Sequence, residues 1–150
     1  MAFQTLILDK RKFIYYTISK YDLKERYMKD PYKKLKIINT FKKYARLGLA
    51  SGRLDAIDTY GRIIGYSRSK KEANELIAVY ETVRFLSICQ KDDALDALFA
   101  VYFSLSGKGI RKSEISERVL RFATESFCDQ RTVYRRLSYV VSVYEQLLEK

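Results

Sequence analysis

The stretch DQRTVYRRLSYVVSVYEQLLEK, residues 129–150, predicts a long amphipathic helix. Its apolar residues recur at the i, i+4, i+7 and i+8 spacing that places them on one side of a helix. They are Val133, Leu137, Val140, Val141, Tyr144, Leu147 and Leu148. Asp129 can accept hydrogen bonds from the free N–H groups of the first turn, so we expect the helix to start there.

Two further helices are expected between residues 91 and 128. DDALDALFAVYFSL predicts a helix that ends near Leu105, and SGKG predicts a turn. Ser113 can cap a second helix, in which Ile115, Val119, Phe122 and Ala123 fall on one face. The stretch from Val119 to Cys128 is longer than the usual tight turn between two such helices. Residues 91–150 are therefore predicted to form a helix-turn-helix-like trihelical unit.

Residues 1–90 are also predicted to be mostly helical. Asp30-Pro31 begins a helix over residues 31–47, and Gly48 supplies its left-handed stop. Ser69 and Glu72 match a capping box for a helix to about residue 90. A shorter helix is expected from Leu54 to Ile64. In the helix from residue 70 we expect one buried side, formed by Ala73, Leu76, Ile77, Tyr80, Val83 and Ser87.

The composition supports an all-α helical bundle that ends in this helix-turn-helix-like unit. One proline and six glycines in 150 residues permit long helices. We divide the chain into a basic, tyrosine-rich helical region, residues 1–90, and a helix-turn-helix-like DNA-binding region, residues 91–150. The two regions form either two cores or one continuous domain. No apolar run reaches the length of a membrane span, so we expect a soluble, cytoplasmic protein with no membrane partner.

The missing residue types restrict the chemistry. The chain has no histidine, which excludes Ser–His–Asp and Cys–His catalysis and every metal site that contains histidine. A disulfide between Cys89 and Cys128 is possible in principle, but in a cytosolic chain both are expected to be buried thiols. Asp92, Asp93 and Asp96 are explained by the start of a helix, where acidic residues are favourable. We therefore expect no enzymatic activity, no cofactor and no metal.

The net charge of +11 lies entirely in the first half of the chain. Residues 1–70 hold 17 Lys and Arg against 6 Asp and Glu, whereas the two groups balance at 12 each in residues 71–150. Such a concentrated surplus suits a phosphate backbone or another anionic surface. The basic face of the 31–47 helix supplies the candidate DNA-binding residues Lys33, Lys34, Lys42 and Lys43.

The aromatic residues interleaved with the Lys and Arg residues from Lys10 to Arg46 permit two interpretations. They either stack on bases, as in single-strand binders, or fill the core of the domain. They are Phe13, Tyr15, Tyr16, Tyr21, Tyr27, Tyr32, Phe41 and Tyr44.

The first turns of the helix from Asp129 carry side chains suited to reading DNA. Arginine recognises guanine and glutamine recognises adenine in the major groove, and hydroxyl groups bind phosphates or bases. The candidate DNA-binding residues here are Gln130, Arg131, Thr132, Tyr134, Arg135, Arg136 and Ser138, with Lys112 from the preceding helix. The three arginines occupy the positive end of the helix dipole without acidic partners at i+4, where DNA phosphate would supply the missing charge. The other interpretation is an ordinary solvated face.

The segments KSEISERV and ATESFCDQRTVYRRLSYVVSVYEQLLEK resemble the helix-turn-helix of phage late-transcription regulators of the RinA and ArpU type, which is similar to sigma region 4. The shared pattern is Glu114-Ile115, the cap Asp129, Thr132-Val133 and then Arg135-Arg136-Leu137. The resemblance covers residues 91–150. It implies DNA binding in phage or mobile-element transcription.

The leading hypothesis is a sequence-specific regulator of transcription that reads the major groove of double-stranded DNA with the helix from Asp129. The alternative is a helical interaction protein that modulates host machinery, such as RNA polymerase or a nuclease, through its basic surface. A homodimer on two half-sites is a further expectation. Tyr139, Val143 and Tyr144 either form its interface or pack on the first half of the chain.

Overall fold

The computed structural model describes residues 31–51, 55–106 and 109–149, and in these residues every regular element is helical. The predicted all-α class is confirmed. The Asp30 cap and the aromatic residues from Phe13 to Tyr27 lie outside the described residues. The elements are α2 (Pro31–Arg46), the short 3-10 helix η2 (Leu49–Ser51), α3 (Ala56–Tyr66), α4 (Lys70–Ile88), α5 (Asp92–Ala100), α6 (Lys112–Glu125) and α7 (Gln130–Leu148).

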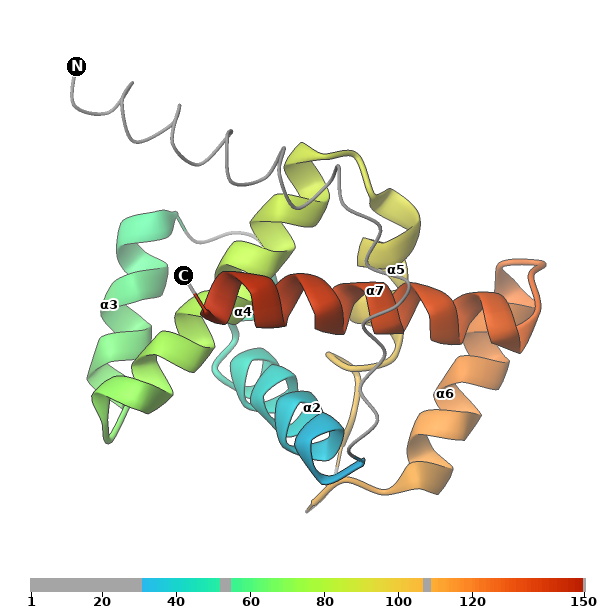
Figure 1. The fold of residues 1–150 in the computed structure, drawn as a ribbon, viewed down its shortest axis with the longest axis horizontal. Coiled ribbons are helices and arrows are strands. Elements are labelled where there is room, and N and C mark those ends of the chain that lie inside the picture. Colours follow the sequence, from blue (N-terminus) through green and yellow to red (C-terminus); the bar gives the residue numbers. More distant parts are fainter. Residues whose placement is uncertain (1–30, 52–54, 107–108, 150) are drawn as a thin grey trace.

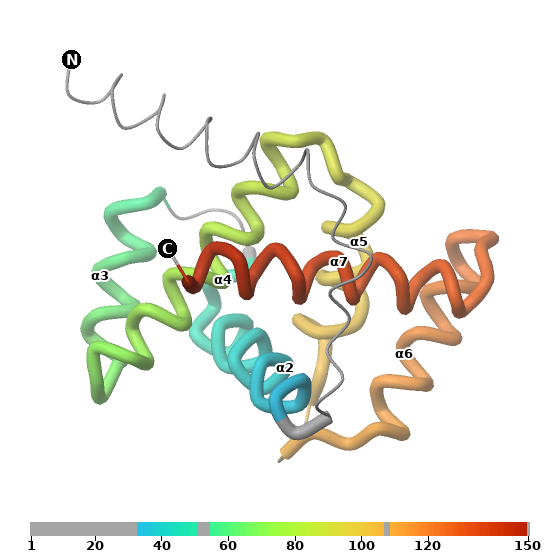
Figure 2. Tube along the Cα trace, in the orientation of Figure 1, coloured from blue at the N-terminus to red at the C-terminus, as the bar shows by residue number. Residues whose placement is uncertain are grey.

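Helices α4 and α7 cross at the centre of the molecule, and the other helices surround them (Figures 1 and 2). α2, α3, α5 and α7 all pack on α4, while α5, α6 and α7 contact one another pairwise. The turn between α6 and α7 lies at one end of the molecule, and α3 lies at the opposite end.

Helix α4 begins where the capping box predicts it. The Ser69 hydroxyl oxygen accepts a hydrogen bond from the Glu72 N–H at 3.1 Å. The prediction of a single buried side is wrong, because neighbours pack around α4 from several directions. The predicted Ser87 is exposed, whereas Ala78, Thr82 and Phe85 are among its buried residues.

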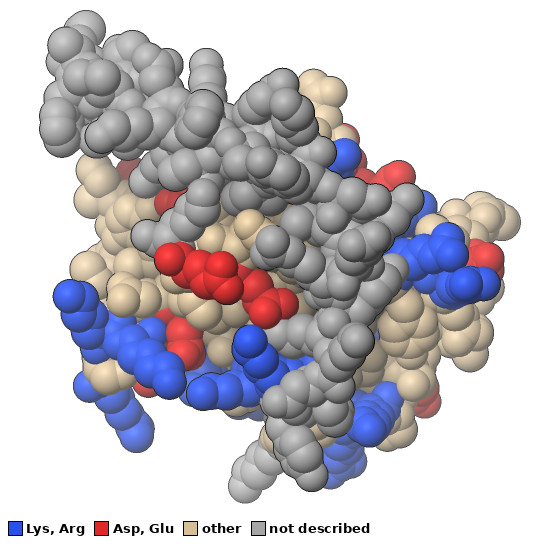
Figure 3. Space-filling view, viewed as in Figure 1, with Lys and Arg blue, Asp and Glu red and all other residues tan. Residues whose placement is uncertain are grey.

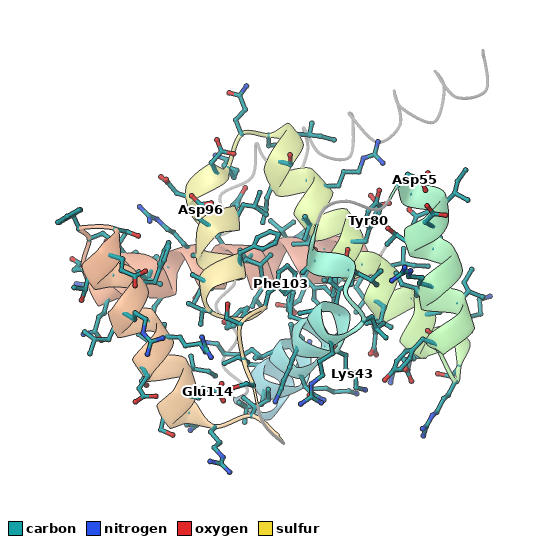
Figure 4. The ribbon with its side chains drawn as sticks, turned by 180° about the vertical axis from the view of Figure 1, so that it is seen from behind. Lys43, Asp55, Tyr80, Asp96, Phe103 and Glu114 are labelled. Atoms are coloured by element: carbon teal, nitrogen blue, oxygen red, sulfur yellow. The ribbon has the colours of Figure 1, made fainter. Side chains whose placement is uncertain are left out.

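One hydrophobic core includes residues from both predicted regions. Phe41 of α2 is fully buried, and its ring centroid lies 5.3 Å from that of Tyr144 in α7. Phe41 also contacts the rings of Tyr102 and Phe103, which follow α5. Figure 4 labels Phe103. Phe41 and Tyr44 are thus core residues, which excludes them from base stacking.

Two helix ends differ from the predictions. α5 ends at Ala100 rather than near Leu105, and the following turn directs Tyr102 and Phe103 towards Phe41. α6 begins at Lys112, so Ser113 lies inside the helix and does not cap it.

The last two turns of α7 pack against the first half of the chain. Val143 and Tyr144 are buried within the chain, which excludes them from the surface of a dimer. The Cys89 and Cys128 side chains are half-buried, whereas buried thiols were expected.

Candidate nucleic-acid interface

Helix α7 is positioned by its cap and by its apolar stripe. The Asp129 carboxylate accepts a hydrogen bond from the Thr132 N–H at 2.7 Å, which confirms the predicted start. Hydrogen bonding to the Thr132 side chain and then to its N–H lowers the pKa of Asp129, so the cap carries a negative charge at neutral pH. Val133 and Leu137 are buried in the core, as predicted.

The opposite side of α7 is open to solvent. Gln130, Arg131 and Arg135 are exposed, and Tyr134 is 37% exposed. Thr132 and Ser138 are half-buried at the edges of this face. Four of the predicted DNA-binding side chains therefore share one accessible surface on the first two turns.

The connection from α6 to α7 is short. α6 continues to Glu125, so the residues predicted to form a long connection are mostly helical, and only residues 126–129 separate the helices. The Cys128 N–H bonds the Ala123 carbonyl at 3.0 Å and the Phe127 N–H bonds the Thr124 carbonyl at 3.4 Å. This is a Schellman turn, and Phe127 occupies its left-handed position with φ +55°.

Arg136 differs from the other two arginines. Its guanidinium nitrogen Nη2 lies 3.7 Å from a carboxylate oxygen of Asp93 at the start of α5. The sequence-based prediction concerned partners at i+4 within the helix, and this ion pair differs from that case because Asp93 comes from another helix. Arg135 and Arg136 line an open pocket of about 640 Å³ together with Asp92 and Asp93. Arg136 thus forms an ion pair with α5 at the protein surface.

Three predicted residues from three helices meet in a second pocket of about 310 Å³. Lys34 of α2, Lys112 of α6 and Tyr134 of α7 line it, together with Ser116. The rest of the lining is apolar or aromatic, from Leu35, Ile38, Ile115 and Tyr102, and the ammonium and hydroxyl groups are of the types that bind phosphates. Ser116 was not predicted, although it lies one turn after Lys112 on α6, a spacing that identifies neighbours on a helix.

The remaining α2 lysines do not form one basic face. Lys33 is exposed, and its Nζ lies 3.6 Å from a carboxylate oxygen of Glu145 in α7. Lys43 is half-buried (Figure 4). The expected placement of Lys42 on the outer face is wrong, because this residue is only 2% exposed and its Nζ donates a hydrogen bond to the Gly109 carbonyl at 2.7 Å. Lys42 therefore holds the loop before α6 against α2.

Glu114 has a structural role in the same loop. Its carboxylate accepts hydrogen bonds from the Ser106 N–H at 2.7 Å and the Ser106 hydroxyl at 3.2 Å (Figure 4). Arg118 Nε lies 3.6 Å from the same carboxylate. Hydrogen bonding from the Ser106 backbone is the main cause that lowers the pKa of Glu114.

The charges of α7 run against its dipole. Apart from the cap Asp129, the N-terminal turns hold Arg131, Arg135 and Arg136 and no acidic residue, and the C-terminal turns hold Glu145 and no basic residue in the last turn. Figure 3 shows Lys and Arg atoms over the start of α7 and Asp and Glu atoms over its end. The helix dipole favours the reverse order of charges. This charge order opposes helix stability and places a positive field at the accessible end.

Comparisons with protein-family models, curated proteins and solved structures found no match for this chain. Within the described residues, no three cysteine or acidic side chains gather in a group that could hold a metal ion. None of the described helices is both long enough and apolar enough to cross a membrane.

Proposed function

We propose that this protein is a sequence-specific regulator of transcription that binds double-stranded DNA and reads the major groove with the start of α7. The observation that carries the proposal is the exposed set Gln130, Arg131 and Arg135 on the first two turns of a helix that follows a tight turn. A recognition helix presents these side-chain types to base edges from these positions. The mutual packing of α5, α6 and α7 provides the rigid support that such a helix needs.

The pocket between α2, α6 and α7 supplies phosphate contacts in this proposal. Lys34, Lys112 and Tyr134 lie beside the reading face, so one phosphate of the backbone would sit there while the arginines reach the bases. Arg136 and Lys42 take structural roles instead, through Asp93 and Gly109. The resemblance of residues 91–150 to phage late-transcription regulators supports the same function and a phage or mobile-element origin.

The test is selection of binding sites from random duplex DNA at about physiological salt. Wild type is compared with the double variant Arg131→Ala/Arg135→Ala and with Arg62→Ala/Arg68→Ala. The second pair removes the same charge from exposed positions at the α3 end of the molecule. We expect an enriched site that the control retains and the α7 variant loses, since each bidentate base contact contributes about 1–3 kcal/mol.

Equal loss of binding in the two double variants would contradict groove reading, because only overall charge would then matter. Weak binding that disappears with rising salt, with no enriched site for wild type, would reject sequence-specific DNA binding.

A second candidate is the interaction protein that modulates host machinery. The observation that favours it is on α3, where Ile57 is 81% exposed and Ile64 is 64% exposed on one side of the helix. Exposed apolar residues grouped on one element are typical of protein contacts. The variant Ile57→Asp/Ile64→Asp distinguishes the two candidates: it should leave DNA selection unchanged and prevent binding of a protein partner such as RNA polymerase.

A further inference from the structure

Phe127 combines two unfavourable properties in the turn before α7. Its side chain is 97% exposed, the largest exposed fraction among the large apolar residues of the described chain. Its backbone has φ +55°, a left-handed conformation that favours glycine or asparagine. A Schellman turn is usually accompanied by an apolar contact, and in this turn Cys128 and Ala123 occupy the two positions that can make it. Cys128 is half-buried and Ala123 is buried. Neither the backbone nor the packing of this turn benefits from a phenyl group.

The end of α4 provides a comparison within the same chain. Gln90 has the same φ of +55° in a turn of the same type, where the Lys91 N–H bonds the Leu86 carbonyl at 2.8 Å. That position holds a polar residue that suits its exposure to water. A turn of this kind is thus compatible with a hydrophilic side chain. The phenyl group of Phe127 is therefore better explained by a contact with another molecule.

The position of Phe127 indicates which contact this is. It lies three residues before Gln130, the first residue of α7, in the turn at the end of the molecule (Figure 1). The exposed Arg131 follows within the first turn of the helix. A partner that binds the reading face of α7 will therefore come close to the turn that carries the exposed phenyl group. Because this face is cationic, the partner is expected to be an anionic polymer with apolar groups.

We propose that Phe127 is a specificity-determining residue that contacts the C5-methyl group of a thymine at the edge of the site read by α7. The inference rests on the proposed function. The thymine methyl is the apolar group that the major groove presents, and phenylalanine is among the side chains that contact it. Such a contact removes both the phenyl face and the methyl from water, and it adds sequence preference without adding charge.

The experiment uses the full chain and the duplex site selected with wild type. Each thymine is replaced in turn by deoxyuridine, which lacks only the methyl group. Binding is measured for wild type, Phe127→Gly and Arg131→Ala. We expect one thymine at the edge of the site at which loss of the methyl weakens wild-type binding about fourfold, as expected for one buried methyl group. Phe127→Gly should bind the thymine site more weakly and show no difference between thymine and deoxyuridine there.

Two controls separate this contact from general weakening. Arg131→Ala should bind less tightly overall but keep the methyl effect, because its side chain contacts other groups. Phe127→Gly should leave the salt dependence of binding unchanged, since no charge is lost. Its thermal unfolding temperature should rise, as should that of Gln90→Gly, because glycine relieves the left-handed backbone in both turns. An altered fold therefore does not explain a loss of binding.

Three results would overturn the inference. The first is that the selected site has no preferred thymine at its edge. The second is that Phe127→Gly still binds thymine more tightly than deoxyuridine at that position. The third is that Phe127→Gly binds the site with the same affinity as wild type. The last result combined with loss of a co-purifying protein would assign the phenyl group to a protein contact instead. Failure of wild type to select any site rejects the proposed function itself, so the two failures are distinguishable.

Discussion

Single polar residues hold the loop before α6 in place, and Glu114 is one of them. Its carboxylate accepts two hydrogen bonds from Ser106, and the lowered pKa means that the folded state favours the ionised form. This stabilisation is present above the unfolded pKa of about 4.5 and is lost as the pH falls through the lower folded value. We expect Glu114→Gln to reduce the free energy of unfolding at about pH 6, and the difference from wild type to shrink towards about pH 3.

Urea unfolding followed by circular dichroism at several pH values measures this difference. Glu117→Gln is the matched control, because Glu117 is exposed on the same helix. A difference between wild type and Glu114→Gln that stays constant with pH would show that Glu114 does not contribute through its charge.

Lys42 is the residue for which burial changes the interpretation most. Its Nζ donates a hydrogen bond to the Gly109 carbonyl while its stem is packed in the protein. We expect Lys42→Met to lower the free energy of unfolding by about 1 kcal/mol, the usual contribution of one hydrogen bond. Lys42→Ala should cost more, at about 0.8 kcal/mol for each lost methylene.

DNA binding distinguishes the structural role of Lys42 from a phosphate contact. Lys42→Met should keep the salt dependence of wild type, since its Nζ bonds within the chain. Lys36→Met, an exposed change on the same helix, controls for the lost charge. If the DNA binding of Lys42→Met depends less steeply on salt than that of wild type, and Lys36→Met shows no such change, Lys42 contacts a DNA phosphate.

At the scale of one helix, α7 illustrates a conflict between stability and binding. Arg131 occupies the first turn, where the dipole disfavours positive charge. We expect Arg131→Glu to raise the free energy of unfolding by about 0.3–1 kcal/mol, because the new carboxylate complements the dipole and can pair with Arg135 at i+4. The same change should abolish DNA binding.

Chemical unfolding and DNA titration of the same samples test this trade-off. Arg62→Glu is the matched control, since Arg62 is exposed in the middle of α3, where the dipole has little effect. If Arg131→Glu is less stable than wild type, Arg131 stabilises the fold, and its position at the helix start is then no evidence for a binding role.

The elements also show which features can be predicted from sequence. The cap and apolar stripe of α7 are local patterns, and both predictions are confirmed. The buried faces of α4 depend on four neighbours, which no local period encodes. The turn after α6 was missed because its left-handed position holds Phe127 instead of the glycine that usually marks such a turn. The ion pair of Arg136 with Asp93 was missed because its partner lies on another helix.

At the scale of the whole molecule, the core unites the basic first half with the proposed reading helix. Tyr144 of α7 is 1% exposed and packs on Phe41 of α2, and Lys33 pairs with Glu145 between the same helices. A phosphate contact from Lys34 in the first half can therefore be held in a fixed position relative to Tyr134. The positive charges of the first half then contribute to DNA binding in two ways, through the fixed position of Lys34 and through the overall electric field.

This shared core predicts that the described helices unfold together. We expect Tyr144→Ala to lower the free energy of unfolding of the full chain by about 3–5 kcal/mol, the usual cost of removing a buried aromatic ring. Tyr66→Ala, at a position 47% exposed on α3, should cost much less. Hydrogen exchange of α2 and of α7 should accelerate to the same extent in Tyr144→Ala, because both helices lose protection in one cooperative step. Faster exchange in α7 alone would instead indicate that the last three helices form a separate unit, and Lys34 would then have no fixed place beside the DNA.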